Sequence, residues 1–266
     1  MINFVLMKLM GIINLTPDSF FAPSRYNYSM LDREVDIIDA GAVSTRPGAP
    51  DVDVEEEWRR LELFLEMWHD RYGANPECGR WMRDRQCWNN HGDCPRELSI
   101  DTTSSEIVRR AHEIVGPFIV NDISAGHDDP KMLRTVGRLG LPYVAMHKRG
   151  NPRTMDSLAD SGTDIIIQLK NYFQEFAIAA ENEDIEDWIL DPGLGFAKTA
   201  EQNIEIIKRL EELQVFGRPI LVGVGDKRFT HVSPGPDMSP DPVSGNYSSY
   251  YESLAAAHGA NILRIH

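Results

Sequence analysis

The stretch from Glu97 to Ile123 reads ELSIDTTSSEIVRRAHEIVGPFIVNDI and contains one complete unit of the predicted fold. It opens with a short apolar run that ends at Asp101. Apolar residues then recur at spacings of three and four from Ser105 to Val115, and a second apolar run covers Phe118 to Ile123. The two outer runs predict strands and the middle segment predicts a helix with one apolar face. A strand, a helix and a strand in succession predict a parallel pair joined by a crossover.

The same order recurs on both sides of this unit. Further apolar runs that end in polar or glycine-rich turns are Val5 to Leu15, Val35 to Val43, Tyr143 to His147, Trp188 to Asp191, Pro219 to Gly225 and Asn261 to His266. Further helical patterns are Val54 to Trp68, Pro130 to Leu139, Ile165 to Ala180 and Ala200 to Leu213. About eight strands, with no G-x-G-x-x-G after the first, favour a closed TIM (β/α)8 barrel over an open doubly wound sheet. We therefore expect one barrel domain over residues 1–266.

Two regions interrupt this rhythm. Residues 71–96 are rich in Trp, Cys, Asn and Arg and predict an irregular insertion, while Ser233 to Ser249, with its prolines, glycines and serines, predicts an irregular loop. The segment before Val35 is short for a crossover helix, and the sequence ends at His266 with no segment for a closing helix. We therefore expect a shortened first helix and a missing last helix.

The composition restricts the partners and the compartment. A net charge of -14 and a pI near 5.0 argue against binding to nucleic acid or to an anionic membrane surface. The apolar run from Phe4 to Leu15 is too short to span a bilayer. Cys78, Cys87 and Cys94 lie near His91 but form no C-x-x-C pair, so plain thiols are favoured over a zinc site. Their odd number, with no signal peptide, predicts a reducing cytoplasm.

Polar residues follow the apolar strand bodies along the whole chain. They are Asn14, Ser44, Thr45, Arg46, Asp101, Asn121, Asp122, His147, Arg149, Asp191, Lys227, Arg264 and His266. The carboxyl ends of the strands form one face of a barrel, and barrel enzymes carry their active sites there. We therefore expect one polar pocket at this face.

Three motifs make this pocket more specific. Residues 10–20 read MGIINLTPDSF, residues 44–49 read STRPGA, and residues 189–199 read ILDPGLGFAKT. Alone, the second motif could be an exposed turn, because Pro-Gly favours turns. The third lacks the G-x-x-x-x-G-K-[ST] spacing of a phosphate-binding P-loop. In this order the motifs resemble those of the dihydropteroate synthase family, which are TIM barrels that bind pterins, and the resemblance covers nearly the whole chain.

The resemblance implies a role for each strand end. Pterin would be bound by Asp101, Asn121, Asp191 and Lys227, and pyrophosphate by Asn14, Thr45, Arg264 and His266. The catalytic residues implied are Asn14, Thr45, Arg46, Lys227, Arg264 and His266. Asn14 would also bind Mg²⁺, which prefers oxygen ligands and substrate phosphates. A strand-end Asp can be merely a helix cap, but a buried carboxylate and amide also match the N–H donors of a pterin edge.

The reaction implied is the displacement of pyrophosphate from 6-hydroxymethyl-7,8-dihydropterin diphosphate by the amine of p-aminobenzoate, which gives dihydropteroate. Sulfonamides would compete with p-aminobenzoate, and the resemblance also allows a homodimer. Two alternatives stay open: a pterin-binding methyltransferase, and a pterin-binding barrel without turnover. The second arises because Gly225-Asp226-Lys227 stands where the family has Ser-Arg-Lys, which removes a hydrogen bond expected at the p-aminobenzoate carboxylate, and because the sequence ends at His266 where the family continues. If Asp226 faces the p-aminobenzoate site, its charge repels that anionic substrate.

Overall fold

The computed structural model describes residues 7–16, 28–43, 51–73, 96–148 and 164–265. Eight parallel strands form one sheet in the order β6-β5-β4-β3-β2-β1-β8-β7. Their bounds are β1 Lys8–Asn14, β2 Ile37–Gly41, β3 Glu97–Asp101, β4 Ile119–Asp122, β5 Tyr143–Met146, β6 Trp188–Asp191, β7 Leu221–Gly223 and β8 Ile262–Ile265. Each strand lies within one of the predicted apolar runs, so the expected strand order is confirmed.

The sheet closes between its two outer strands, β6 and β7. A parallel bridge joins Leu190 to Ile220, and the amide of Leu190 donates to the carbonyl of Pro219 at 2.9 Å. Every other neighbouring pair of strands forms a ladder of at least three residue pairs. The predicted TIM barrel is therefore confirmed, and its least paired seam lies between β6 and β7.

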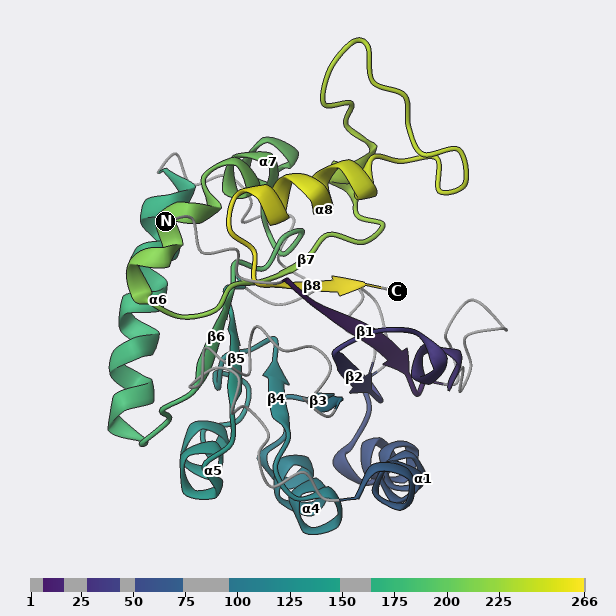
Figure 1. Cartoon of the computed structure of the whole chain (residues 1–266). Coiled ribbons are helices and arrows are strands. Elements are labelled where there is room, and N and C mark those ends of the chain that lie inside the picture. The colour runs from purple at the N-terminus through teal and green to yellow at the C-terminus, as the bar shows by residue number, and fades with distance from the viewer. Residues whose placement is uncertain (1–6, 17–27, 44–50, 74–95, 149–163, 266) are drawn as a thin grey trace.

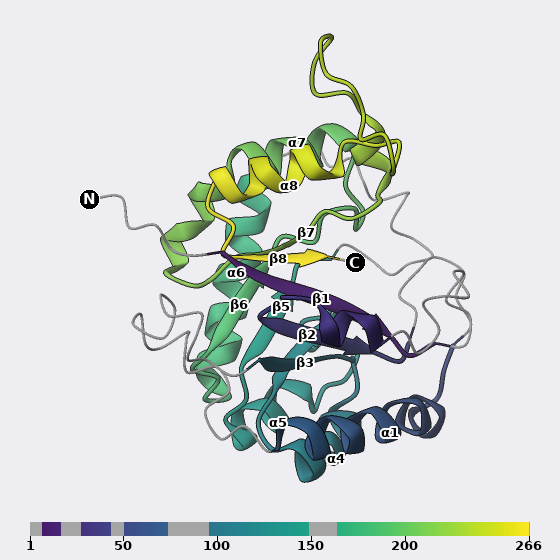
Figure 2. The ribbon, with the colours of Figure 1, turned by 45° about the vertical axis from the view of Figure 1, so that its right-hand side comes forward.

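Helices cover the outside of the barrel, as Figures 1 and 2 show: α1 and α4 lie on one side and α7 and α8 on the opposite side. The α-helices are α1 Val54–Tyr72, α4 Ser105–Val115, α5 Met132–Leu139, α6 Ile165–Asn182, α7 Ala200–Lys208 and α8 Ser248–Ala257. Three short 3-10 helices are η2 Tyr28–Asp32, η4 Leu210–Phe216 and η5 Arg228–His231. The first crossover thus contains only a 3-10 turn in its described part.

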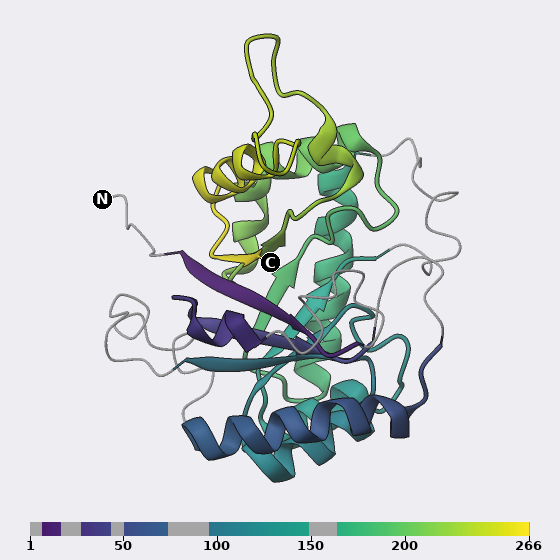
Figure 3. The ribbon, with the colours of Figure 1, turned by 90° about the vertical axis from the view of Figure 1, so that its right-hand side faces the viewer.

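Two helix predictions were wrong in detail. The helix expected over Ala200 to Leu213 is divided at Arg209, whose backbone leaves the helical region at φ -122° and ψ 21°, and the chain continues as η4. Helix α8 was not predicted, and it begins inside the expected Ser233 to Ser249 loop. Its signal was the run Leu254 to Ala257, which consists of strong helix formers. The loop before α8 projects away from the barrel in Figure 3.

Apolar side chains form two cores. The smaller core fills the barrel interior with one residue from each of seven strands: Met10, Ile37, Ile119, Val144, Ile189, Leu221 and Ile262, all fully buried. The larger core lies between the strands and the helices, and includes Phe64, Phe118, Phe173 and Tyr251. Successive side chains of a strand point to opposite faces of a sheet. Residues two positions after the interior core therefore also face the barrel interior.

The predicted insertion at residues 71–96 is described only at its ends. Helix α1 runs to Tyr72, and residues 74–95, including the three cysteines and His91, lie outside the described residues. At the other end, the guanidinium of Arg96 donates to the backbone carbonyls of Leu31, Arg33 and Val35 at 2.5 to 3.1 Å. Arg96 thus ties the start of β3 to the segment that enters β2.

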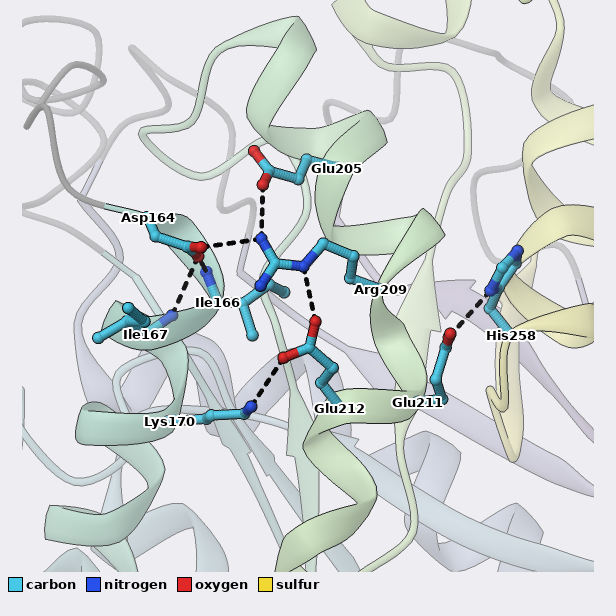
Figure 4. A network of polar contacts seen from close by, with 9 residues as sticks. All are labelled: Asp164, Ile166, Ile167, Lys170, Glu205, Arg209, Glu211, Glu212 and His258. Carbon is cyan, nitrogen blue, oxygen red and sulfur yellow. Dashed lines mark hydrogen bonds and ion pairs between the residues drawn. The ribbon is translucent and has the colours of Figure 1, made fainter.

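A network of ion pairs joins α6, α7 and η4 on the outer surface (Figure 4). The guanidinium of Arg209 donates to Asp164 at 2.9 Å and to Glu205 and Glu212 at 2.7 Å, and Glu212 also accepts from Lys170 at 2.8 Å. These bonds lower the pKa of Glu212 to about 2. Because the groups are largely in solvent, the network fixes the position of the helix break at Arg209 more than it adds stability.

Among the described residues, no helix has the length and apolar character that crossing a membrane requires.

Candidate active site

A polar layer lies directly above the apolar core of the barrel interior. Moving two residues along each strand from Ile37, Ile119, Ile189 and Ile262 leads to Asp39, Asn121, Asp191 and Arg264. The register of β3 places Ser99 beside Asp39, and Asp101 beside Gly41 and Asn121. The structure therefore brings Asp101, Asn121, Asp191 and Arg264 to the carboxyl end of the barrel interior, where the sequence predicted the pocket.

Arg264 lies between two carboxylates. Its Nε donates to Oδ2 of Asp39 at 2.7 Å, its Nη2 lies 2.7 Å from the same oxygen, and Nη2 donates to Oδ2 of Asp101 at 3.0 Å. Asp39 also accepts from Oγ of Ser99 at 2.7 Å and from Nδ2 of Asn121 at 3.1 Å. One hydrogen-bonded network therefore connects β2, β3, β4 and β8.

Asp39 was not among the predicted site residues, although it is fully buried. It was read as part of a buried strand body, because it lies inside the apolar run Val35 to Val43. Its spacing could have revealed it: Asp39 lies two residues after Ile37 and two before Gly41, so all three lie on the same face of the strand. A buried carboxylate in the interior phase of a strand requires a charged or hydrogen-bonding partner.

The environment of Asp101 raises the pKa of its carboxyl group from 3.8 to about 7. Burial is the main cause, and the guanidinium of Arg264 opposes it. The carboxylates of Asp39, Asp122 and Glu57 raise the pKa further. Asp101 therefore changes its charge near neutral pH, within a pocket that also holds Arg264.

This raised pKa predicts a pH-dependent effect of Asp101→Asn. Because the pKa of Asp101 is higher in the folded than in the unfolded chain, its favourable contribution exists below about pH 4 and is lost as the pH rises through about 7. Asparagine does not ionise, so the variant does not lose this stability as the pH rises. The difference in unfolding free energy, variant minus wild type, should therefore increase between pH 4 and pH 8 by a few kcal/mol, on the order of 1.4 per pKa unit. Urea unfolding at both pH values measures this. The exposed control Asp226→Asn should show no such change, and parallel curves for Asp101→Asn and wild type would contradict the assignment.

Asp191 and Lys227 form the second half of the polar layer. Oδ1 of Asp191 accepts from the amide of Gly193 at 2.7 Å, and Nζ of Lys227 donates to the carbonyls of Leu194 and Gly223, both at 2.7 Å. Burial lowers the pKa of Lys227 to about 8, although the nearby charge of Asp191 raises it. Burial also raises the pKa of Asp191, and Lys227 opposes this. The two residues lie on either side of the seam between β6 and β7.

The turn after Asp191 is held by a second lysine. Nζ of Lys198 donates to the backbone carbonyls of His147, Gly193 and Phe196 at 2.7 to 3.2 Å. The side-chain amide of Asn203 also donates to the carbonyls of Lys198 and Thr199. Lys198 therefore supports the turn, and the charge of Lys227 lowers the pKa of Asp191 more than that of Lys198 does.

Gly193 should not tolerate a side chain. It has φ +63°, and a Cβ atom built on it would lie 2.1 Å from the carbonyl oxygen of His147. Gly217 has the same φ of +63°, but a Cβ atom there would meet nothing within 4 Å. We expect Gly217→Ala to cost about 1 to 2 kcal/mol from the left-handed backbone alone. Gly193→Ala should cost clearly more, and should also lower pterin affinity because its amide holds Asp191. Thermal unfolding of both variants measures the two losses of stability. Equal losses would show that the backbone moves to relieve the contact between the new Cβ and the carbonyl of His147 without a further loss of stability.

The other predicted residues have different outcomes. Asn14 is the last residue of β1, pairs with Gly41 and is half-buried. Asp122 is buried outside the pocket, where it accepts from the hydroxyl of Tyr143 at 2.7 Å and from the turn amides of Ser124 and Gly126. The predictions for Ser44, Thr45, Arg46, Arg149 and His266 lie outside the described residues.

The placement of Asp226 against p-aminobenzoate is not supported. Its side chain is 75% exposed, Oδ1 lies 2.8 Å from Nε2 of His231, and the same oxygen accepts from Nδ2 of Asn246 at 3.1 Å. Solvent screens an exposed charge strongly. Asp226→Arg should therefore change the KM for p-aminobenzoate by less than about threefold, rather than by the tenfold or more expected for a carboxylate in the pocket.

The fold and this site define a (β/α)8-barrel protein with a buried layer of carboxylates, an amide and cations at the carboxyl ends of its strands. The pterin binding enzyme family matches residues 10–75 and 90–266. The chain belongs to this family, which confirms the resemblance inferred from the motifs.

The names of several similar proteins agree with this family assignment. A dihydropteroate synthase of Synechocystis is 36% identical over 97% of this chain and 84% of its own length, and that of Escherichia coli K12 is 33% identical over 97% and 86%. The folic acid synthesis protein fol1 of Pneumocystis carinii is 38% identical, but the chain spans only 34% of its length.

Solved structures give the same picture. The dihydropteroate synthase of Xanthomonas albilineans with 4-aminobenzoic acid is 29% identical with a TM-score of 0.74, and covers 98% of this chain and 87% of its own. The Yersinia pestis dihydropteroate synthase with a sulfonamide drug complex is 26% identical with a TM-score of 0.77, and covers 98% and 88%.

Proposed function

We propose that the chain is a transferase that condenses 6-hydroxymethyl-7,8-dihydropterin diphosphate with p-aminobenzoate to give dihydropteroate and pyrophosphate. The observation that carries this proposal is the polar layer above the apolar barrel core, in which acceptors and cations are buried side by side. The dihydropteroate synthases of Synechocystis and Escherichia coli, which the chain matches over most of their lengths, support it.

The pterin end of the substrate would lie over the carboxyl ends of β3, β4, β6 and β7. A pterin presents N–H donors on its amino-pyrimidine edge, and the carboxylates of Asp101 and Asp191 are acceptors. Asp191 is buried, and its Oδ1 already accepts from the amide of Gly193, so a heterocycle without those donors would offer nothing to its second oxygen. Lys227 would donate to a ring acceptor from the opposite side of the seam.

The diphosphate end would lie near β1 and β8. Arginine binds phosphate oxygens through two parallel N–H groups, which suits Arg264. In the reaction the bond between the pterin methylene carbon and the diphosphate oxygen breaks, and that carbon bonds to the amine of p-aminobenzoate, which then loses a proton. The cation stabilises the charge that develops on the departing oxygen. Thr45, Arg46 and His266 would contribute to the same end, and their roles stay predictions.

Magnesium would be bound at Asn14. The amide oxygen of Asn14 is a hard ligand, and a protein site that supplies one or two oxygens while substrate phosphates and water supply the rest is usual for Mg²⁺. No group of three or more His, Cys, Asp or Glu side chains that could hold a metal lies within the described residues. The donor set therefore fits an ion that enters with the diphosphate, and when bound it would supply charge neutralisation of the leaving group.

The alternatives are less well supported. A methyltransferase is not favoured, since the relatives above are named for dihydropteroate and folic acid synthesis. A barrel without turnover was suggested by Gly225, Asp226 and the end of the sequence at His266. The exposed position of Asp226 removes the charge argument, and the relatives named dihydropteroate synthase favour turnover. Inhibition by sulfonamides, a homodimer and a cytoplasmic location stay proposals, the first in keeping with the Yersinia pestis structure.

The test is a coupled assay of pyrophosphate release by the purified chain from pterin diphosphate, with and without p-aminobenzoate and with and without Mg²⁺. We expect release that depends on p-aminobenzoate and Mg²⁺, with dihydropteroate formed in equal amount. Pterin binding by calorimetry without any dihydropteroate would favour the barrel without turnover.

A further inference from the structure

Asp39 is the most deeply buried charged group of the site, and no role has yet been assigned to it. It lies in the middle of β2 with no exposed surface, two residues above the fully buried Ile37. Burying an ionised carboxylate costs several kcal/mol unless its oxygens are well paired. Three strands supply the partners: Ser99 from β3, Asn121 from β4 and Arg264 from β8. A carboxylate that costs this much free energy to bury is expected to have a function in the site.

The contact with Asp39 fixes the plane of the Arg264 guanidinium. Nε and Nη2 both lie 2.7 Å from Oδ2 of Asp39, and Nη2 also donates to Asp101 at 3.0 Å. A guanidinium is planar and carries five N–H donors in a fixed fork. With one edge on Asp39, the Nη1 group points elsewhere, and within the described residues it has no protein acceptor. An anionic ligand would bind at this remaining edge of the guanidinium.

The same carboxylate fixes the amide of Asn121. A carboxylate can only accept, so Nδ2 and not Oδ1 of Asn121 must face Asp39, at 3.1 Å. The carbonyl oxygen of the amide is then turned away from Asp39 as an acceptor. Without Asp39, the amide could present either atom to a ligand.

We propose that Asp39 is a positioning residue that aims the guanidinium of Arg264 at the diphosphate and the amide oxygen of Asn121 at the N–H donors of the pterin. Asp39 does not touch the substrate, and Ser99 holds its second oxygen in place. This inference rests on the proposed function, because it assumes a ligand with an anionic end and a donor-rich ring.

A simpler role for Asp39 would be to balance the charge of Arg264. Asp101 also contacts Arg264, so the charge alone does not require Asp39. Charge balance and positioning predict different results for a variant that keeps the charge of Asp39 but lets its carboxylate move. Ser99→Ala is such a variant, because it removes the 2.7 Å bond to Oδ1 of Asp39 and leaves the carboxylate in place.

The electrostatics give an independent readout. The charged groups that act on Asp101 are Arg264 from β8, which contacts it, and at longer range Asp39 from β2, Asp122 from β4 and Glu57 from α1. The negative charge of Asp39 raises the pKa of Asp101 more than that of Asp122 or Glu57 does. Asp39→Asn keeps the shape and removes that charge. The pKa of Asp101 should then fall, and the limb of the pH profile of kcat/KM that Asp101 controls should move to lower pH.

The experiment compares Asp39→Asn, Ser99→Ala and the control Asp122→Asn with wild type. Asp122 is as fully buried as Asp39 but binds Tyr143 outside the pocket. Since a hydrogen bond to a charged group contributes about 1.5 to 3 kcal/mol, Asp39→Asn should raise the KM for pterin diphosphate by roughly 10- to 100-fold. The KM for p-aminobenzoate, at saturating pterin, should change by less than about threefold, because that amine makes no contact through Asp39.

Ser99→Ala should raise the pterin KM by roughly 3- to 10-fold with an unmoved pH profile, in line with the loss of one ordinary hydrogen bond. Asp122→Asn should keep both KM values within about twofold, even if its melting temperature falls. An unchanged pterin KM in folded Ser99→Ala, or in Asp39→Asn, overturns the positioning role. If Asp39→Asn does not fold, Ser99→Ala alone decides.

The two proposals fail in different ways. If the wild type forms no dihydropteroate but binds pterin diphosphate in calorimetry, the proposed function fails, and the affinities of Asp39→Asn and Ser99→Ala for the same ligand still test Asp39. If the wild type is active and both variants match it, the function stands and the role of Asp39 is wrong.

Discussion

Arg264→Ala is expected to destabilise the fold by about 3 to 5 kcal/mol, because it leaves a buried carboxylate without its cationic partner. Asp39 is fully buried, and Asp101 is only 13% exposed. The guanidinium holds down the pKa of Asp101, so without it that pKa in the folded state would rise further above the value in the unfolded chain. The loss of stability should therefore be larger at pH 8 than at pH 5.

Urea unfolding at the two pH values measures this effect, and Arg110→Ala provides a matched control. The side chain of Arg110 is 24% exposed, close to the 26% of Arg264, and it also binds two carboxylates, Glu55 and Glu106. Those partners are 74% and 41% exposed and solvent screens them, so Arg110→Ala should destabilise the fold far less than Arg264→Ala does. Similar costs for the two variants would mean that water reaches Asp39.

Asp191→Asn should weaken pterin binding by roughly 10- to 100-fold, the effect of exchanging a charge-assisted hydrogen bond for a neutral one in a dry pocket. The asparagine keeps the size of the side chain, but its NH₂ group would face either the pterin donors or the amide of Gly193. Calorimetry with the pterin diphosphate measures the affinity.

Asp122→Asn is the control for this substitution, since Asp122 is also a buried strand-end carboxylate, but it accepts from the hydroxyl of Tyr143 on β5 and from the turn after β4. It should bind pterin as the wild type does. An Asp191→Asn variant with wild-type affinity would refute the role of Asp191 as an acceptor.

Much of the fold could be predicted from the sequence, because a parallel barrel repeats one simple signal. Each buried strand is a short apolar run, and the first polar residue after it marks the carboxyl end of the barrel. That rule located Asp101, Asn121, Asp191 and Arg264. Helix α8 escaped because it follows a loop rich in proline and glycine, and its buried face is small, with Tyr251 and Ala255.

The sequence left two features of the site undetermined for one reason. Asp39 was missed, and the position of Asp226 relative to the p-aminobenzoate site was left conditional, because a linear reading judges a residue by its distance from the end of a strand. Burial depends instead on the phase of the side chain and on what its neighbours offer. Asp39 lies before the end of β2 but points inward to three donors, whereas Asp226 lies after β7 and finds His231 and Asn246 at the surface.

The weakly paired seam of the barrel lies directly below the two residues proposed to bind opposite sides of the pterin. Asp191 ends β6 and Lys227 follows β7. The backbones of these two segments are joined by the bridge from Leu190 to Ile220. A molecule that accepts from Lys227 and donates to Asp191 would link β6 to β7 through its own hydrogen bonds. Transient separation of β6 and β7 would then be rarer in the bound state, and amide hydrogen exchange in β7 would report directly how much of the protein is occupied.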